Sequence, residues 1–387
     1  MNWIYLDNSA TTRPCAEAVD KITELLTVCW GNPSSLHGLG FAAEQELSAA
    51  RRAVARSLSC TPEEIFFTSG GTESDNLAIF GAAHARQKRG RHVVTTRIEH
   101  PAVLNTMAEL EREGFEVTYL APDEWGHIAP ESVKSAVRPD TILVSLMAVN
   151  NEVGTILPVQ AAREAIAEQN APALLHVDAV QAYGKLPLAP ARQGIDLLTI
   201  SGHKIHGPKG VGALYVKKGV HLAPRVFGGG QESNVRPGTE GLPLIAGFGA
   251  AVAALPDLAA EEERIRALNR RLRERLAALD GVTIHSPDDA LPYILSFSAC
   301  PVRAETMLHF LSERGICVSS GSACAKGKAS HVLTAMNLPK EQIASSLRVS
   351  FSRGNTEADV DALADALAEG LRTLAARLTP RGRLRKS

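Results

Sequence analysis

The sequence predicts an α/β protein of two domains, built around a mostly parallel β-sheet that helices cover. From about residue 60, short apolar runs alternate with helical patterns, which is typical of parallel strands joined by helical crossovers. At 387 residues, the chain also exceeds the roughly 250–300 residues over which a single hydrophobic core usually grows. We therefore expect a second, smaller domain beside the sheet.

Seven short apolar runs are the expected strands of the large domain. Several are apolar throughout, without the alternation of a sheet that has one solvent-facing side, so both faces should be buried. The runs are Ile65–Thr68, His92–Thr96, Glu116–Leu120, Ile142–Met147, Leu174–Asp178, Leu197–Ser201 and Val211–Val216. Helices are expected between them at Glu73–Arg89 and at Pro101–Arg112, with Gly114 ending the second.

The second α/β domain is expected after a long helical stretch of mixed charge, Leu258–Leu279. A final helix should begin after Thr356, which forms a capping-box pattern with Asp359, and end near Leu378. The expected strands between these helices are Val282–His285, Ile294–Ser298, Ile316–Ser319 and Leu347–Phe351. We therefore predict a large domain at 15–254, a small domain from 1–14 and 255–378, and a basic, disordered tail at 379–387.

The charge balance points to a small ligand. The chain has 41 Lys and Arg against 42 Asp and Glu, which leaves no basic field for direct nucleic-acid binding and no acidic excess typical of disorder. No apolar segment approaches the ~20 residues that span a bilayer, and the first residues show no basic segment followed by an apolar one. We expect a cytoplasmic protein without membrane contact.

The cysteines are expected to be reduced thiols and to hold no metal. They form no C-x-x-C pair and no dense disulfide framework, and the closest two, Cys317 and Cys324, have no matching His pattern. The six positions are Cys15, Cys29, Cys60, Cys300, Cys317 and Cys324.

The segment Ser201-Gly202-His203-Lys204, at the end of an apolar run, is the most informative for function. A lysine at the mouth of a buried strand can form an imine with an aldehyde cofactor, and a strand-end carboxylate such as Asp178 can keep a pyridinium nitrogen protonated. Either residue alone is equally consistent with an ordinary loop lysine or strand-end carboxylate. Together they predict a site for pyridoxal 5'-phosphate.

Two small-residue loops add to this prediction. Residues 68–76 join a strand to a helix through Gly70 and Gly71, where free N–H groups and the helix dipole favour a phosphate. Residues 321–329 superficially resemble a nucleotide-binding P-loop, but the second glycine falls one place late and Ala329 replaces the required Ser or Thr. This second loop instead places Cys324 among glycines and lysines, which predicts a mobile thiolate nucleophile, with a buried inert cysteine as the alternative.

Ordered motifs along almost the whole chain resemble the pyridoxal phosphate-dependent cysteine desulfurases of the class V aminotransferase superfamily, the group that includes the bacterial IscS and NifS proteins. The motifs are Tyr5–Thr12, Gly31–Ser35, Gly71–Asn76, Glu99-His100, Asn150–Glu152, the Asp178 and Lys204 segments, Arg236–Thr239 and Ser320–Cys324. The resemblance implies fold type I of these enzymes, which is aspartate aminotransferase-like. It also implies that the large domain binds the cofactor and that the small domain carries the Cys324 loop.

The resemblance implies roles around the cofactor ring. Lys204 would form the covalent bond to the cofactor and act as the base, Asp178 would pair with the pyridine nitrogen, and Gln181 would contact the phenolic oxygen. His100 would stack on the ring and is a candidate proton carrier. Asn151 would lie near both the cofactor and the substrate.

The resemblance also implies roles at the phosphate and at the substrate. The phosphate would be bound by Gly71, Thr72, Ser201 and His203. Thr239 would reach the phosphate from the second subunit of a homodimer. Arg348 would bind the substrate carboxylate, because its planar fork matches two oxygens.

The activity implied is that of a sulfurtransferase that converts L-cysteine to L-alanine. Cys324 would take the sulfur as a persulfide and pass it to an acceptor protein, either an iron–sulfur scaffold or a tRNA-thiolation enzyme. The loop between Cys324 and His331 is shorter than in IscS proteins and carries lysines, and the tail is basic, so the acceptor stays open.

Other functions on the same scaffold are a selenocysteine lyase, an aminotransferase and a non-catalytic subunit of a sulfur-transfer complex. An aminotransferase has no need of a loop thiol, so Cys324 argues against it. A pure scaffold has no use for Lys204, Asp178, His100 and Cys324 together. A preference for selenocysteine stays open.

Overall fold

The structure is a computed structural model that describes residues 3–320 and 329–378. The chain forms two compact units, a larger one of residues 11–151 and 156–260 and a smaller one of 1–10, 152–155 and 261–387. The boundaries predicted from the sequence, after residues 14 and 254, differ from these by a few residues. The short segment 152–155, which the sequence assigns to the large domain, belongs to the smaller unit. The predicted tail at 379–387 lies outside the described residues.

The larger unit contains the predicted seven-stranded, mostly parallel sheet. Its order is β2-β8-β7-β6-β5-β3-β4, and β8 alone runs antiparallel to its two neighbours. The strands lie almost at the predicted bounds: β2 (Ile65–Thr68), β3 (His92–Thr96), β4 (Glu116–Leu120), β5 (Thr141–Met147), β6 (Leu174–Asp178), β7 (Leu197–Ser201) and β8 (Gly212–Val216). The buried patterns of β3, β5, β6 and β7 confirm that the central strands are covered on both faces.

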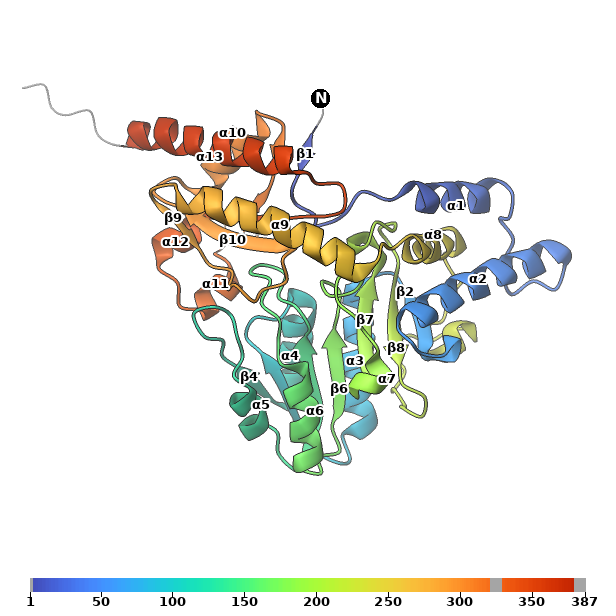
Figure 1. Ribbon diagram of the computed structural model, residues 1–387. Coiled ribbons are helices and arrows are strands. Elements are labelled where there is room, and N and C mark those ends of the chain that lie inside the picture. The colour runs from blue at the N-terminus through green and yellow to red at the C-terminus, as the bar shows by residue number, and fades with distance from the viewer. Residues whose placement is uncertain (1–2, 321–328, 379–387) are drawn as a thin grey trace, which may run out of the picture. The chain divides into compact units, whose positions relative to one another are not determined.

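Helices lie on both faces of this sheet, with α6 in front of it and α3 behind it in Figure 1. The helix at Pro101–Arg112 has the predicted bounds, and Gly114 follows it with φ +85°, as expected of a glycine stop. The α-helices are α1 (Ala16–Thr27), α2 (Gly38–Ser57), α3 (Gly71–Arg86), α4 (Pro101–Arg112), α5 (Pro130–Ala136), α6 (Val159–Glu168), α7 (Pro190–Gln193) and α8 (Leu242–Ala253). Short 3-10 helices are η1 (Pro62–Glu64), η2 (Gly202–Lys204) and η3 (Gln231–Asn234).

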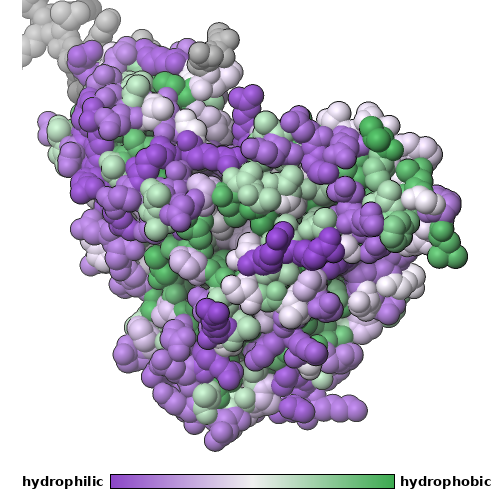
Figure 2. Space-filling view, turned by 45° about the vertical axis from the view of Figure 1, so that its right-hand side comes forward, coloured by the Kyte–Doolittle hydropathy of each residue, from purple (hydrophilic) through white to green (hydrophobic). Residues whose placement is uncertain are grey.

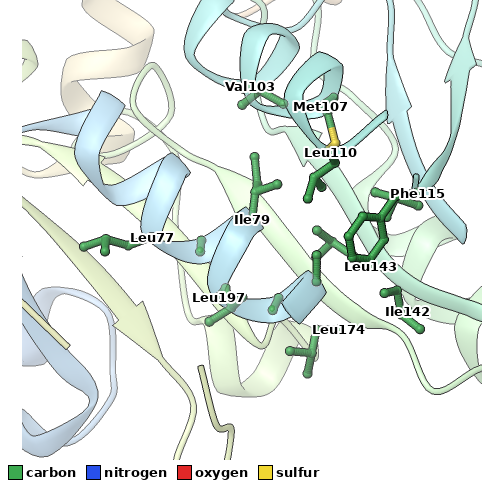
Figure 3. Packing of buried hydrophobic residues seen from close by; sticks show 14 of the residues in the cluster. Leu77, Ile79, Val103, Met107, Leu110, Phe115, Ile142, Leu143, Leu174 and Leu197 are labelled. Atoms are coloured by element: carbon green, nitrogen blue, oxygen red, sulfur yellow. The ribbon is translucent and has the colours of Figure 1, made fainter. Parts of the chain in front are cut away.

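The core behind the sheet is formed by α3, α4 and the central strands (Figure 3). Ile79 of α3 and Met107 of α4 are fully buried together with Leu143 of β5 and Leu197 of β7. Each such side chain contributes about 1.5–3 kcal/mol relative to an exposed one. This packing fixes α3 and α4 against the central strands.

The described residues of the smaller unit form two sheets. A two-stranded parallel sheet pairs β1 (Ile4–Tyr5) with β11 (Ile316–Cys317), and an antiparallel sheet has the order β12-β13-β10-β9. The prediction of one strand at Ile316–Ser319 is wrong, because the chain leaves the first sheet after Cys317 and enters the second at Ser319. The strands of the antiparallel sheet are β9 (Val282–Ile284), β10 (Ile294–Ala299), β12 (Ser319–Ser320) and β13 (Ser346–Ser350).

Five helices lie in or adjoin the described part of the smaller unit. They are α9 (Leu258–Ala277), α10 (Ala304–Ser312), α11 (His331–Ala335), α12 (Lys340–Ala344) and α13 (Glu357–Leu378). The capping box of α13 is confirmed: Thr356 N donates to Asp359 Oδ2 at 3.0 Å, and Asp359 N donates to Thr356 Oγ1 at 3.4 Å. In 3–320 and 329–378, no single helix is long and apolar enough to cross a membrane, and only α8 and α9 taken together pass that test.

Candidate active site

One edge of the large sheet gathers most of the predicted site residues. Asp178 ends β6, Lys204 ends η2 directly after β7, and Gly71 begins α3 after β2. His100 and Asn151 lie in the segments that follow β3 and β5. Because these strands are parallel, their carboxyl ends share an edge, which is where open α/β sheets bind ligands.

Asp178 is buried at the end of β6, and its carboxyl group responds to Lys204. Burial raises the pKa of Asp178 to about 6, while the N–H of Val180 and the Lys204 ammonium oppose that rise. The Val180 N–H donates to Asp178 Oδ1 at 2.9 Å. The carboxyl group is therefore held in place and can respond to a protonated nitrogen brought beside it.

The junction of β2 with α3 and the end of β7 form a cradle for an anion. Ser201 Oγ is buried and has no hydrogen-bond partner among the described residues. A Cβ on Gly71 would lie only 2.8 Å from Val180 Cγ2, so a larger residue at this first helical position would require Val180 to shift, and Thr72 beside it is exposed. An unpaired hydroxyl group and a glycine-lined helix N-terminus fit the phosphate of pyridoxal 5'-phosphate.

His203 borders the same edge as a neutral imidazole. Burial, followed by the charges of Lys204, Lys209 and Lys185, lowers the pKa of His203 to about 4. Its Nδ1 lies 3.2 Å from Thr11 Oγ1. A neutral imidazole held by a threonine can donate one N–H to an anion without charging the interior.

His100 and Gln181 are each oriented by a neighbour. His100 is the N-cap of α4, and its Nδ1 accepts from Ala102 N at 3.1 Å, so Nε2 is the nitrogen that carries the proton of a neutral ring. Gln181 is buried, and Lys185 Nζ donates to its backbone oxygen at 3.1 Å and to Oε1 at 3.4 Å. Asn151 follows the buried Asn150 in the turn after β5.

Thr239 lies in a different hollow of the larger unit. It is exposed and lines a pocket of about 170 Å³, to which neither Asp178 nor Lys204 contributes. The lining residues are Phe67, Thr68, Ser69, Gly210, Val211, Glu232, Arg236, Thr239, Glu240, Gly241 and Ile245. The role of Thr239 toward a second subunit stays a prediction.

A buried ion pair fixes the chain before Thr239. Arg51 Nη1 and Nη2 donate to Glu232 at 2.8 and 2.6 Å, and the Phe67 N–H donates to the same carboxylate at 2.8 Å. Glu232, Ser233 and Asn234 are all left-handed, with φ of +45°, +52° and +65°. Three consecutive non-glycine residues in this region are strained, and the paired carboxylate holds them.

Arg348 lies on β13 of the smaller unit and is buried rather than part of a surface ion pair. Its Nη2 donates to Asp7 Oδ1 at 2.9 Å. Burial raises the pKa of the nearby Glu152 to about 7, against the hydrogen bond from Ser330 and the charge of Arg348. The role of Arg348 toward a substrate stays a prediction, and Cys324 lies outside the described residues.

A second group of buried polar residues lies beside the Asp178 carboxyl, and the sequence assigned no role to it. Asp75 projects from α3, His176 precedes Asp178 by two residues on β6, and Glu99 precedes the His100 cap. The signal was present: Asp75 interrupts the apolar face of α3 that also carries Ala78. A polar residue on a core-facing helical position requires a buried partner.

The described side chains form neither a metal-binding cluster nor a disulfide bond. In the ranges 3–320 and 329–378, no group of three His, Cys, Asp or Glu side chains could hold a metal ion. The described cysteines, Cys15, Cys29, Cys60, Cys300 and Cys317, are free thiols.

Comparison with known proteins agrees with the fold and shows the family. The aminotransferase class-V family matches residues 4–363. The cysteine desulfurase IscS of Methanosarcina thermophila is 42% identical over 370 residues, which cover 95% of this chain and 91% of that protein. A solved NifS-like protein has a TM-score of 0.90 at 39% identity and covers 96% of this chain and 100% of its own. SspA in complex with cysteine has a TM-score of 0.79 at 36% identity, over 90% of this chain and 98% of its own. The chain therefore belongs to the class V aminotransferase family, and within it to the pyridoxal phosphate-dependent cysteine desulfurases of the IscS/NifS group.

Proposed function

We propose that the protein converts L-cysteine to L-alanine and takes the sulfur onto Cys324 as a persulfide. The observation that supports this most directly is the buried Asp178 carboxyl, whose pKa responds to Lys204 at the end of the neighbouring strand. When bound at this edge, pyridoxal 5'-phosphate supplies an electron sink for charge that develops at the α-carbon of an amino acid. The related SspA was solved with cysteine, which supports cysteine as the substrate.

The residues of the chain divide the work of binding and proton transfer. Asp178 keeps the proton on the ring nitrogen, and Lys204 removes the proton from the α-carbon of the substrate. His100 would stack on the ring, and in its neutral form it carries the proton on Nε2, because its Nδ1 accepts from the Ala102 N–H. Gln181 would donate an amide N–H to the phenolic oxygen, since its Oε1 accepts from Lys185 Nζ.

The phosphate and the substrate carboxylate are held by separate groups. The phosphate is bound by Gly71, Thr72, Ser201 and His203. Arg348 binds the substrate carboxylate through its planar fork, and Asp7 orients that fork at 2.9 Å. Asn151 contacts both the cofactor and the substrate.

The sulfur step belongs to Cys324. Its thiolate attacks the sulfur of the substrate, so that a sulfur–sulfur bond forms while the carbon–sulfur bond breaks. The electron pair of the broken bond stays with the carbon fragment. This fragment gains a proton at the β-carbon, regains at the α-carbon the proton that Lys204 removed, and leaves as alanine. The positively charged lysines near Cys324 in the sequence favour the thiolate that this step requires.

We also propose that the protein acts as a homodimer, with Thr239 completing the phosphate site of the second subunit. Figure 2 shows hydrophobic side chains exposed at the right-hand edge of the view, the side on which α1 and α2 lie in Figure 1. The large apolar side chains there are between 61% and 104% exposed: Leu26, Val28, Trp30, Leu36 and Phe41. Such a cluster is typical of a protein interface. Light scattering should give twice the mass of one chain; a monomer would contradict this part of the proposal.

The persulfide is expected to pass to an iron–sulfur scaffold or to a tRNA-thiolation enzyme. Homologues named IscS support sulfur transfer in general but leave the acceptor open. We place the reaction in the cytoplasm, where a reduced thiol persists.

The decisive experiment compares Cys324→Ala with the matched control Cys317→Ala. With L-cysteine and a thiol reductant, the wild type and the control should release alanine and sulfide in equal amounts. The Cys324→Ala protein should retain the visible absorbance of the bound cofactor but release neither product. Unchanged turnover of Cys324→Ala would refute the mechanism, and alanine formed from selenocysteine alone would favour the selenocysteine lyase.

A further inference from the structure

Asp75 is an interior carboxyl group, and no Lys or Arg among the described residues forms an ion pair with it. It is 1% exposed on α3, and its Oδ1 lies 3.6 Å from His176 Nε2. His176 is itself fully buried, with Nε2 3.1 Å from Thr199 Oγ1 and Nδ1 2.8 Å from Ser145 Oγ. Thr199 also interacts with Asp75, and this interaction lowers the pKa of the Asp75 carboxyl group. Asp75 Oδ1 itself has no hydrogen-bond partner among the described residues. Four polar side chains from α3, β5, β6 and β7 thus form one buried chain.

His176 cannot balance a negative charge on Asp75. It is the one basic group within ion-pair distance of Asp75 in the described part of the chain, and burial lowers the pKa of its imidazole to about 3. The ring is therefore neutral at physiological pH. An ionised Asp75 would be an interior anion without a counter-charge, which is strongly unfavourable.

The neighbouring carboxyl groups also favour the protonated form of Asp75. Burial, followed by the charge of Asp178, raises the pKa of Asp75 well above its ordinary value, and Glu99 adds to that rise. Asp178 differs because the Val180 N–H and the Lys204 cation favour its ionised form. When close carboxyl groups share a site, the proton stays where no cation is near.

We propose that Asp75 is a positioning residue that stays protonated, so that Asp178 carries the negative charge offered to the ring nitrogen of the cofactor. The hydrogen bonds then run in one direction: Asp75 donates to Thr199, Thr199 donates to His176 Nε2, and His176 Nδ1–H donates to Ser145. An ionised Asp75 reverses every one of these bonds, because Thr199 then donates to Asp75. The two cases therefore differ in which nitrogen of His176 carries the proton.

This inference rests on the proposed cofactor site, but its first test needs neither cofactor nor turnover. Nitrogen NMR of the histidine-labelled, cofactor-free protein, with His176 assigned through a His176→Asn variant, reports the tautomer directly. We expect proton on Nδ1 and no titration between about pH 5 and pH 8. Proton on Nε2 would overturn the proposal. Infrared spectroscopy tests the carboxyl group itself. The wild type should show a carboxylic-acid band that is missing in Asp75→Asn.

The second test uses the holoenzyme and a matched pair of variants. Asp75→Asn copies the shape of a neutral carboxyl group, so the pH midpoint of the cofactor's visible absorbance should stay where it is in the wild type. Asp178→Asn removes the charge itself and should move that midpoint by about one pH unit or more. A shift of that size in Asp75→Asn would show that Asp75 is an anion and would overturn the proposal. If Asp75→Asn fails to fold, the wild-type NMR result still decides.

Discussion

Glu232 and Asp75 are both buried carboxyl groups of the larger unit, but they have opposite partners. Glu232 receives both arms of the Arg51 guanidinium and the Phe67 N–H. Among the described residues, Asp75 faces the Thr199 hydroxyl group and the neutral His176 imidazole, and no Lys or Arg forms an ion pair with it. Glu232 is 7% exposed and Asp75 is 1% exposed, so the degree of burial alone does not explain their difference. The partner decides whether a buried carboxyl group anchors the backbone as an anion or stores a proton.

The largest expected effect comes from leaving the Glu232 charge without its partner. Arg51→Met should lower the free energy of unfolding by about 3–5 kcal/mol, because the buried carboxylate keeps its charge and loses its counter-ion. Urea denaturation measures this change. The double variant Arg51→Met, Glu232→Leu should recover part of the loss, since it removes the charge as well. A loss below about 1 kcal/mol in Arg51→Met would mean that the pair behaves as an exposed one.

A smaller effect is expected from Glu99, a third buried carboxyl group. Burial raises its pKa from 4.5 to about 8, against hydrogen bonds from the Met147 N–H and Thr96. The folded state therefore holds this proton more tightly than the unfolded state does, so the stabilisation is complete below pH 4.5 and is lost as pH rises through about 8. The slope should reach at most ~1.4 kcal/mol per pH unit.

Glu99→Gln tests this slope without removing the acceptor for Met147. The free energy of unfolding of the cofactor-free variant, measured between about pH 5 and pH 8, should fall less steeply with pH than that of the wild type. Parallel curves would show that Glu99 is ionised in the fold and resembles Glu232 rather than Asp75.

The smallest effect is expected at an exposed pair of similar geometry. Arg138 places Nη1 and Nη2 2.7 and 2.8 Å from the Glu116 carboxylate, in the same forked arrangement as Arg51. Both side chains are more than a third exposed, so Arg138→Ala should cost at most ~1 kcal/mol, less at high salt. Urea denaturation at two ionic strengths is the check, and a loss equal to that of Arg51→Met would remove burial as the cause of the difference.

The central sheet could be predicted because its strands are apolar on both faces and are separated by helical patterns. Lys204 and Asp178 could be placed at the same edge for a related reason: both follow such strands directly. The break between β11 and β12 could not be predicted, since a strand of four residues looks the same whether it pairs with one sheet or with two.

The protonation of Asp75 could not be predicted from the sequence either. It depends on the absence of a cation among side chains from four elements, and only packing brings these elements together. The assignment of residues 152–155 to the smaller unit could not be predicted for the same reason. The Glu152 carboxyl accepts a hydrogen bond from Ser330, which is distant in sequence. Local sequence patterns identify helices and strands. The protonation state of a buried side chain and the unit to which a segment belongs depend on contacts with residues that are distant in sequence.

The pairing of β1 with β11 has a consequence for how the chain is made. Ile4 lies opposite Ile316, so β1 gains its partner strand only after the long stretch of polypeptide between them has been synthesised. All strands of the seven-stranded sheet, by contrast, emerge before residue 217. Because domains fold as units during synthesis, the large sheet can assemble before β1 has paired with β11. The order of translation therefore completes the seven-stranded sheet first and closes the smaller unit, which carries Arg348, last.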